Sequence, residues 1–391
     1  MIKVLSGNKA AAHGVRLARP DVIAMYPITP QTPLAEELAK FHADGDIDSE
    51  MIEVEGEHTA MSAITGAAVA GGRVFTATSS WGLSYMNEPL MYCAGMRVPA
   101  VMVDVTRETS SMRGVGGSRQ DIMTARDCGW IMIEPENCQE VLDSILMAYR
   151  LSEDPEVLLP VMVAYDGFFL SHQYERVDVP DQALVDTFLA PVADRNRRTT
   201  LNTDRKRHFS ISLAGLEFAY YRKQTLEALD HVKVMYPKIE AEFEAIFGRK
   251  YGMVDEYRTD DADVVFLTAG SSSGTVKTVV DKARSRGIKV GCIRLRMFRP
   301  FPREELAKAL EGKKAVACIE RSICVGWNCG HLFQETRAVL PDVKNPPIMV
   351  DFIDGLSSLD ITVDHIEKAL AITLAAMNGE KVKECNWLIW E

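Results

Sequence analysis

The sequence lacks every cysteine pattern that would hold an iron–sulfur cluster or a zinc ion. Its eight cysteines are scattered, and no two of them are spaced as Cys-x-x-Cys. The two that lie nearest each other, Cys324 and Cys329, stand in Cys-Val-Gly-Trp-Asn-Cys, which is a poor ligand set. We therefore expect reduced, mostly buried thiols and no metal bound by this chain. If the protein takes part in redox chemistry, its electrons must leave through a partner.

Long apolar runs and an excess of positive charge are also absent. No apolar run approaches the ~20 residues that a transmembrane helix needs, and the chain enters an amphipathic pattern from Met1 without a basic and then apolar leader. A net charge of −11 argues against a general binder of nucleic acids or anionic membranes. These absences predict a cytoplasmic protein with no membrane span and no nucleic-acid partner.

Short β-branched runs alternate with amphipathic helices over the first half of the chain, as at 73–78 and 98–105. This alternation predicts a doubly wound parallel α/β sheet that is covered on both faces. A long helix is expected over 215–247. Before it, residues 191–210 are polar and basic, which is typical of a solvated linker, and contact with an acidic partner is the alternative.

A second strand, glycine-rich turn and helix begin at Asp263, with the turn between Gly270 and Gly274. A helix N-terminus of this kind can cradle an anion. The turn lacks the Gly-Lys-[Ser/Thr] of a P-loop, so it is a weak signal for a nucleotide site. We divide the chain into residues 1–235, with a linker and helix over 190–235, and residues 236–391.

Glu57 stands at the junction between a strand end and a helix built largely from Ala, Gly, Ser and Thr, within residues 52–68. A carboxylate at a helix N-terminus is ordinarily stabilised by the helix dipole, which is one interpretation. The other is that a carboxylate beside a small-residue surface shares a proton with a buried nitrogen heterocycle. Upstream, a loop with prolines 27, 30 and 33 is rigid and carries the hydroxyl of Thr29 at the end of a predicted strand, where ligands of α/β sheets bind.

Several motifs occur in one order: Tyr26-Pro-Ile-Thr-Pro, Gly56-Glu-His-Thr-Ala-Met, Thr76-Ala-Thr-Ser-Ser-Trp-Gly-Leu, Ala125-Arg-Asp-Cys-Gly-Trp and Arg294-Leu-Arg-Met-Phe-Arg-Pro-Phe-Pro. Together they resemble the α subunit of the 2-oxoacid:ferredoxin oxidoreductases, the family of pyruvate synthase and the branched-chain 2-ketoacid enzymes. The resemblance covers nearly the whole chain and is weakest between about 190 and 235. It implies a thiamine-diphosphate pyrimidine-type domain followed by a transketolase C-terminal-like domain.

The resemblance also implies roles for particular residues. Glu57 would hydrogen-bond the aminopyrimidine ring of thiamine diphosphate, and Tyr26, Pro27, Ile28, Ser80 and Trp81 would contact the same cofactor. Arg107, at the end of an apolar strand, matches the arginine that binds the substrate carboxylate, for which its planar fork is suited. Thr29 would contact the same substrate. The alternative for Arg107 is a salt bridge to Glu108 or to a neighbouring helix.

The segment after Arg107 departs from the family because it contains three glycines, in Ser110-Ser-Met-Arg-Gly-Val-Gly-Gly-Ser-Arg-Gln-Asp. Fewer rings near the substrate predict a larger pocket, with Gly116 and Gly117 at the substrate. The substrate is then pyruvate or a larger branched-chain or aryl 2-oxoacid such as phenylglyoxylate. Arg113 and Arg119 would bind a coenzyme A phosphate or face solvent. Asp121 is interpreted as a loop anchor.

A Gly-Asp-Gly motif followed about thirty residues later by Asn, which would mark the diphosphate and Mg²⁺ half of a thiamine site, is missing. By the resemblance, a β-type subunit supplies that half, iron–sulfur clusters lie in partner chains, and γ-type and ferredoxin-like subunits complete the assembly. The implied reaction is coenzyme A-dependent oxidative decarboxylation of a 2-oxoacid. The alternatives are half of a non-oxidative thiamine-dependent transferase or decarboxylase, and a non-catalytic scaffold.

Overall fold

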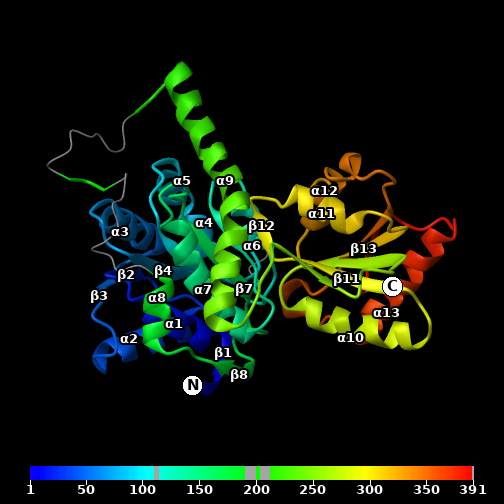
Figure 1. Cartoon of the computed structure of the whole chain (residues 1–391), viewed down its shortest axis with the longest axis horizontal. Helices are drawn as coiled ribbons and strands as arrows, with labels where there is room; N and C mark the ends of the chain where they lie inside the picture. Colours follow the sequence, from blue (N-terminus) through cyan, green and yellow to red (C-terminus); the bar gives the residue numbers. More distant parts are fainter. Residues whose placement is uncertain (110–113, 190–199, 203–211, 390–391) are drawn as a thin grey trace.

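The computed structural model describes residues 1–109, 114–189, 200–202 and 212–389. Figure 1 shows two bodies beside each other, one built around a sheet that comes from the first half of the chain except for one edge strand, and the other around a sheet from the second half. No helix in these ranges is long and apolar enough to cross a membrane.

The first sheet has seven strands in the order β12-β6-β7-β5-β4-β2-β3. These strands are β2 (Val22–Met25), β3 (Glu50–Glu53), β4 (Val74–Thr78), β5 (Val101–Thr106), β6 (Ile131–Ile133), β7 (Val161–Asp166) and β12 (Met297–Arg299). All neighbours pair in parallel except β12 with β6. Every residue of β4, β5 and β7 is buried, as in sheets covered on both faces. The predicted parallel α/β sheet is confirmed.

Two groups of helices cover this sheet. On one face, a shared apolar cluster joins α1 (Gly7–Ala18), α2 (Thr32–Ala43), α7 (Cys138–Ser152), α8 (Gln182–Phe188) and α9 (Gly215–Phe247). On the other face lie α3 (Glu57–Val69), α4 (Trp81–Tyr85), α5 (Asn87–Gly95) and α6 (Gln120–Ala125). A separate antiparallel ribbon pairs β1 (Ile2–Ser6) with β8 (Tyr174–Asp178).

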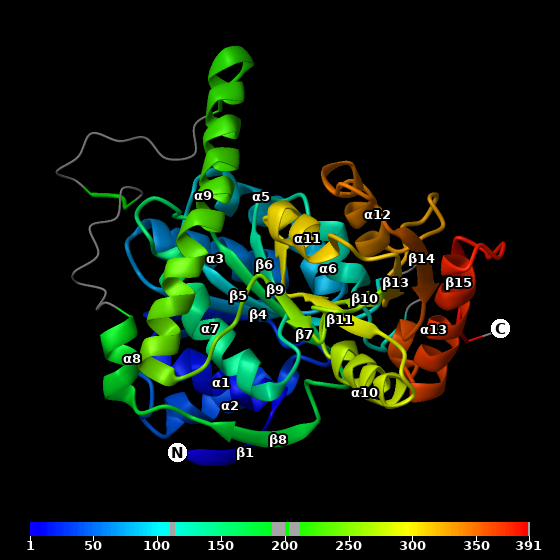
Figure 2. The same ribbon diagram turned by 45° about the vertical axis from the view of Figure 1, so that its right-hand side comes forward.

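Helix α9 confirms the long helix expected over 215–247. It ends at Gly248, whose φ of 70° is the left-handed conformation that glycine adopts at helix ends. In Figures 1 and 2 its N-terminal end projects beyond the body. The division at residue 235 falls inside this helix and stays a prediction, and most of the basic segment 191–210 lies outside the described residues.

The second sheet has six strands in the order β15-β14-β13-β10-β11-β9, and only β9 is antiparallel to its neighbour. Its strands are β9 (Val254–Tyr257), β10 (Val264–Thr268), β11 (Val290–Leu295), β13 (Ala315–Glu320), β14 (Ile348–Ile353) and β15 (Cys385–Trp387). Its helices are α10 (Ser272–Ser285), α11 (Arg303–Leu310), α12 (His331–Arg337), α13 (Val363–Met377) and the 3₁₀ turns η2 (Leu340–Asp342) and η3 (Leu356–Ser358).

The two sheets share buried apolar surface. Leu267 and Ile293 of the second sheet belong to the same cluster as Met61 of α3 and Met102 of β5. The second domain therefore packs directly on the helical layer that contains α3 to α6.

The carboxyl ends of the parallel strands meet at one edge of the first sheet. From β2 the chain crosses to β3 on one side and then returns to β4 on the other, so the strand order reverses between β2 and β4. Ligands of open α/β sheets bind in the crevice at such a reversal. The loops that follow β2, β3, β4, β5 and β7 all reach this edge.

Candidate active site

Glu57 is the first residue of α3 and is only 7 % exposed. Its carboxylate makes no hydrogen bond to any residue that the structure describes. The backbone of α4 lies directly against it, because a Cβ on Gly82 would stand 2.6 Å from Glu57 Oε1 and 2.4 Å from Thr78 Oγ1. Because of this close approach, only glycine fits at position 82.

Hydroxyl groups beside this carboxylate also lack partners. The buried side-chain oxygens of Thr76, Thr78, Ser79 and Thr106 form no hydrogen bond with described residues. Leaving a buried hydroxyl unsatisfied costs about 1–3 kcal/mol. Thr78, Ser79 and Thr106 lie at or just after the carboxyl ends of β4 and β5, so this edge holds buried hydroxyls that the described residues leave without partners.

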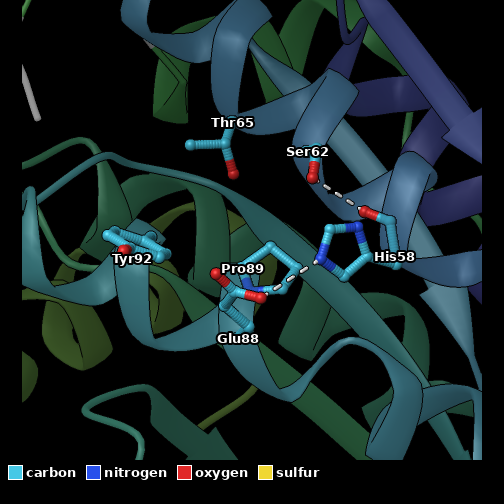
Figure 3. Close-up of a pocket in the computed structure, with 6 residues that line it drawn as sticks. All are labelled: His58, Ser62, Thr65, Glu88, Pro89 and Tyr92. Atoms are coloured by element: carbon cyan, nitrogen blue, oxygen red, sulfur yellow. Dashed lines mark hydrogen bonds and ion pairs between the residues drawn. The ribbon is translucent and has the colours of Figure 1, made fainter.

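Large side chains surround the edge and stay exposed. Tyr26 in the loop after β2 is 37 % exposed, Trp81 is 42 % exposed and Tyr85 is 61 % exposed. Beside them, α3 and α5 enclose a hollow of about 230 Å³. In Figure 3, His58 points across this hollow toward Glu88, and their Nε2 and Oε2 atoms lie 3.7 Å apart. His58 is thus paired with Glu88 at the surface.

Arg107 and Thr29 come together although 78 residues separate them. Arg107 Nη1 donates to the Thr29 carbonyl at 2.8 Å, and Nε donates to the Gly114 carbonyl at 3.2 Å. No carboxylate pairs with this guanidinium among the described residues, so the alternative of a salt bridge to Glu108 is wrong. Burial lowers the pKa of Arg107, and its Nη2 group makes no hydrogen bond to a described residue.

Asp121 holds two parts of the site at once. Its Oδ2 accepts from the backbone N–H of Arg107 at 2.7 Å and from that of Ser80 at 3.0 Å. Ser80 has a φ of 55°, a conformation that costs about 1–3 kcal/mol for a non-glycine residue. Its hydroxyl donates to the Glu108 carbonyl at 2.6 Å. The loop-anchor prediction for Asp121 is therefore confirmed.

Asp104 lies on β5 beside Asp121, and both are fully buried. Burial and the charge of Asp121 raise the pKa of Asp104 well above its usual range. Neither oxygen of Asp104 has a donor partner among the described residues, whereas Asp121 accepts three N–H bonds. Two adjacent buried carboxyls cannot both ionise readily, so Asp104 is the protonated member of the pair and Asp121 the carboxylate.

The glycines after Arg107 are explained by close packing of the backbone, and not by the larger pocket that was expected. Gly116 and Gly117 are buried, and a Cβ on either would lie 2.2 Å from backbone atoms, those of Ser357 and Gly167 respectively. Close backbone approach therefore occupies the space that was expected to enlarge a pocket. Contact of these two glycines with substrate stays a prediction.

Arg119 neither faces solvent nor binds a phosphate, so both expectations for it are wrong. It is buried and makes a two-pronged ion pair with Glu134, at 2.5 and 2.6 Å. Glu320 of the second domain lies 3.8 Å away. Because its charge is already paired in the interior, it joins the two domains. Arg113 lies outside the described residues.

The Gly270 turn does cradle an anion, and that anion belongs to the chain itself. Asp166, at the end of β7, accepts from the Ser271 backbone N–H at 2.7 Å and pairs with Arg321. A free phosphate is therefore not needed to explain this turn. The remaining predicted cofactor residues, Pro27 and Ile28, lie in the loop after β2, where Ile28 N donates to Gln31 Oε1 at 3.3 Å.

Sequence reasoning missed Asp104 and Asp166. Asp104 interrupts the buried strand Val-Met-Val-Asp-Val-Thr, and a carboxyl in such a strand was a visible signal. Asp166 also ends an otherwise apolar strand. Its partners come from the second domain, however, and no local sequence pattern predicts them.

Comparison with known proteins gives two family matches. Residues 13–241 match "Pyruvate flavodoxin/ferredoxin oxidoreductase, thiamine diP-bdg". Residues 262–366 match "Pyruvate:ferredoxin oxidoreductase core domain II".

Relatives align over nearly the full chain. Pyruvate synthase subunit PorA of Pyrococcus furiosus is 43% identical over 396 residues, covering 100% of this chain and 98% of the relative. The α subunit of the NADH-dependent phenylglyoxylate dehydrogenase of Aromatoleum evansii is 41% identical over 382 residues, covering 95% and 91%.

Solved structures share the fold. A 2-oxoglutarate:ferredoxin oxidoreductase from Magnetococcus marinus superposes with a TM-score of 0.70 at 20% identity, over 94% of this chain and 65% of that one. A split-gene transketolase superposes with a TM-score of 0.54 at 12% identity, over 95% of this chain and 100% of that one.

Proposed function

The chain belongs to the 2-oxoacid:ferredoxin oxidoreductase family as an α-type subunit, and from that membership we propose its part in the reaction. It contributes one half of a thiamine diphosphate site and the groups that bind a 2-oxoacid. The reaction is coenzyme A-dependent oxidative decarboxylation to an acyl-CoA and CO₂. The electrons pass to iron–sulfur clusters in partner chains and then to ferredoxin or another acceptor.

The buried, unpartnered carboxylate of Glu57 at the strand reversal is the observation that carries this proposal. The fit to an aminopyrimidine is supported by the hydroxyls of Thr78 and Ser79, which lack partners. The backbone of Gly82 lies against the Glu57 carboxylate and the Thr78 hydroxyl, so these two polar groups stand side by side. Glu57 would hold a ring nitrogen, with Tyr26, Pro27, Ile28, Ser80 and Trp81 lining the same edge. Bound thiamine diphosphate would supply the electron sink that decarboxylation of a 2-oxoacid needs.

Arg107 and Thr29 would bind the substrate. The free Nη2 of Arg107 suits a carboxylate, because a guanidinium forms short, charge-assisted bonds to carboxylate oxygens. Its pKa is lowered by burial but starts so high that the group stays charged. The exposed hydroxyl of Thr29, on the loop that Arg107 Nη1 holds, would contact the same substrate.

Partner subunits complete the site. The relatives are themselves named as subunits, and this chain has no motif for the diphosphate and Mg²⁺. A β-type subunit would supply that half against the exposed Trp81, Tyr85 and Tyr92. γ-type and ferredoxin-like subunits would carry the remaining functions, and the whole complex would be cytoplasmic.

The substrate is pyruvate or a larger 2-oxoacid, and relatives with either kind of name are comparably similar. The test is substrate-dependent reduction of a low-potential dye, with coenzyme A, by the native complex purified through this chain. Pyruvate, 2-oxoisovalerate, phenylglyoxylate and indolepyruvate would be compared. Preference for one of them supports the proposal. Decarboxylation without dye reduction would instead favour a non-oxidative enzyme, and absence of bound thiamine diphosphate would favour a scaffold.

A further inference from the structure

The glycine loop after Arg107 is bonded to the second domain. Gly117 N donates to the Ser358 hydroxyl at 2.6 Å, and Ser358 N donates back to the Gly117 carbonyl at 2.9 Å. The backbone of Ser357 lies so close to Gly116 that no Cβ fits between them. Two hydrogen bonds and a backbone contact therefore fix this end of the loop to η3.

The other end of the loop is bonded to the substrate-binding candidate. Arg107 Nε donates to the Gly114 carbonyl at 3.2 Å, and Glu108 N donates to the Gly116 carbonyl at 3.0 Å. Residues 114–117 thus connect η3 to the guanidinium of Arg107. A shift of Gly117 would move the carbonyl of Gly114 and with it one of the two hydrogen bonds that orient Arg107.

The η3 turn is held in a strained conformation. Ser357 and Ser358 have φ of 53° and 65°, in the left-handed region that non-glycine residues rarely adopt. Asp354 supports the turn: its Oδ1 accepts from Gly355 N at 2.8 Å, and its Oδ2 lies 2.8 Å from His365 Nδ1. Such strain persists only where the surroundings fix the backbone, which is what a positioning element requires.

We propose that Ser358 is a positioning residue for the 2-oxoacid site, through which the second domain sets how tightly and how selectively Arg107 binds substrate. The proposal rests on the proposed function. It differs from a purely structural role because Ser358 acts on the orientation of one guanidinium and not only on domain packing.

The test is Ser358→Gly in the native complex. Glycine removes the hydroxyl acceptor but adopts positive φ without strain, so folding is not expected to suffer. Loss of one such hydrogen bond should raise KM for the preferred 2-oxoacid about three- to tenfold and leave kcat little changed. The ratio of kcat/KM between small and large 2-oxoacids should change as well. Asparagine tolerates this φ and carries an acceptor oxygen. In Ser358→Asn, KM should therefore lie between the values of Ser358→Gly and wild type.

Thr373→Ala is the matched control. Thr373 is buried on α13, its hydroxyl donates to the Ala369 carbonyl at 2.8 Å, and neither residue supports η3. Loss of this hydroxyl should lower the unfolding temperature without changing KM or selectivity. Equal changes in KM in Ser358→Gly and Thr373→Ala, or no change in Ser358→Gly, would overturn the proposal.

A readout without catalysis separates this proposal from the proposed function. Hydrogen exchange of a peptide covering residues 114–118 should be faster in the Ser358→Gly complex than in wild type, because Gly117 N–H loses its acceptor. Unchanged exchange would overturn the positioning role even in an active enzyme. If exchange is faster but no 2-oxoacid is oxidised by wild type, the proposed function fails and the selectivity role falls with it.

Discussion

The carboxyl edges of the two parallel sheets have the same architecture, but they differ in whether polar groups there find partners within the chain. At the first, the carboxylate of Glu57 and the hydroxyls of Thr78 and Ser79 have no partners among the described residues. At the second, Ser271 N–H and Arg321 bind Asp166, and Lys277 binds Glu136 at 2.9 Å. Carboxylates from the first domain therefore bind the turns of the second edge, although Arg321 Nη2 has no partner among the described residues.

We therefore call the edge of the first sheet the binding edge. The edge of the second sheet, whose turns bind residues of the first domain, is the docking edge. Unsatisfied buried polar groups destabilise a protein unless something binds them, so the first edge is shaped for groups that come from outside. The second edge contributes rigidity, because its turns hold Asp166 and Gly117 at the rim of the first. The comparison makes four predictions, given from the largest expected effect to the smallest.

Glu57→Gln should lower the rate of dye reduction with a 2-oxoacid by about a hundredfold or more, which is the loss expected when a general acid–base group is removed. The complex should stay assembled. Glutamine keeps the size of the side chain and removes its charge. Glu55→Gln is the control, since Glu55 lies two residues earlier, is exposed and accepts a hydrogen bond from the Thr59 hydroxyl at 2.5 Å. Equal loss in both variants would remove Glu57 from the reaction.

Asp166→Asn should break the docking edge. Both Asp166 and Arg321 are buried, and removing one partner of a buried pair costs roughly 3–5 kcal/mol. The midpoint of thermal unfolding should fall clearly. Asp342→Asn, in the exposed pair with Arg303, should change it little. A midpoint unchanged by Asp166→Asn would show that the edge is not held in this way.

Arg107→Lys should raise KM for the 2-oxoacid about ten- to hundredfold, because lysine cannot keep the bonds to Thr29 and Gly114 and still bind a carboxylate. Arg126→Lys is matched, since Arg126 also bonds a carbonyl, that of Met123 at 2.7 Å, but lies outside the site. Steady-state kinetics distinguish them. A KM in Arg107→Lys equal to that of Arg126→Lys would contradict the assignment.

Asp104→Asn should change the dependence of stability on pH. The folded-state pKa of Asp104 is raised. The stability that its protonated carboxyl contributes is therefore fully present below the usual carboxyl pKa range, and it is lost as pH rises toward the folded pKa. The expected slope is at most about 1.4 kcal/mol per pH unit, with stability falling as pH rises. Asparagine is neutral, as the protonated acid is, and does not titrate, so unfolding of the variant should depend less on pH. Asp48→Asn, at an exposed position, should keep the wild-type slope.

The sequence allowed the fold class, the helix over 215–247 and the positions of Glu57, Thr29 and Arg107 at strand ends to be predicted, because apolar periodicity and local motifs determine these features. It could not reveal the partners that cross between domains. Gly117 and Ser358 are 241 residues apart, and Arg119 finds Glu320 only after the domains dock. For the same reason the sequence predicts an open pocket from the glycines after Arg107, whereas the backbones of Ser357 and Gly167 lie where a Cβ on Gly116 or Gly117 would stand.

The most direct test of the central claim, that the first edge is half of a cofactor site, is thiamine diphosphate binding measured by calorimetry. The isolated chain and the native complex, each stripped of cofactor and supplied with Mg²⁺, would be compared. The account predicts binding by the complex, strong weakening in the Glu57→Gln complex, and none by the isolated chain. Tight binding by the isolated chain, or equal binding by the wild-type and Glu57→Gln complexes, would contradict it.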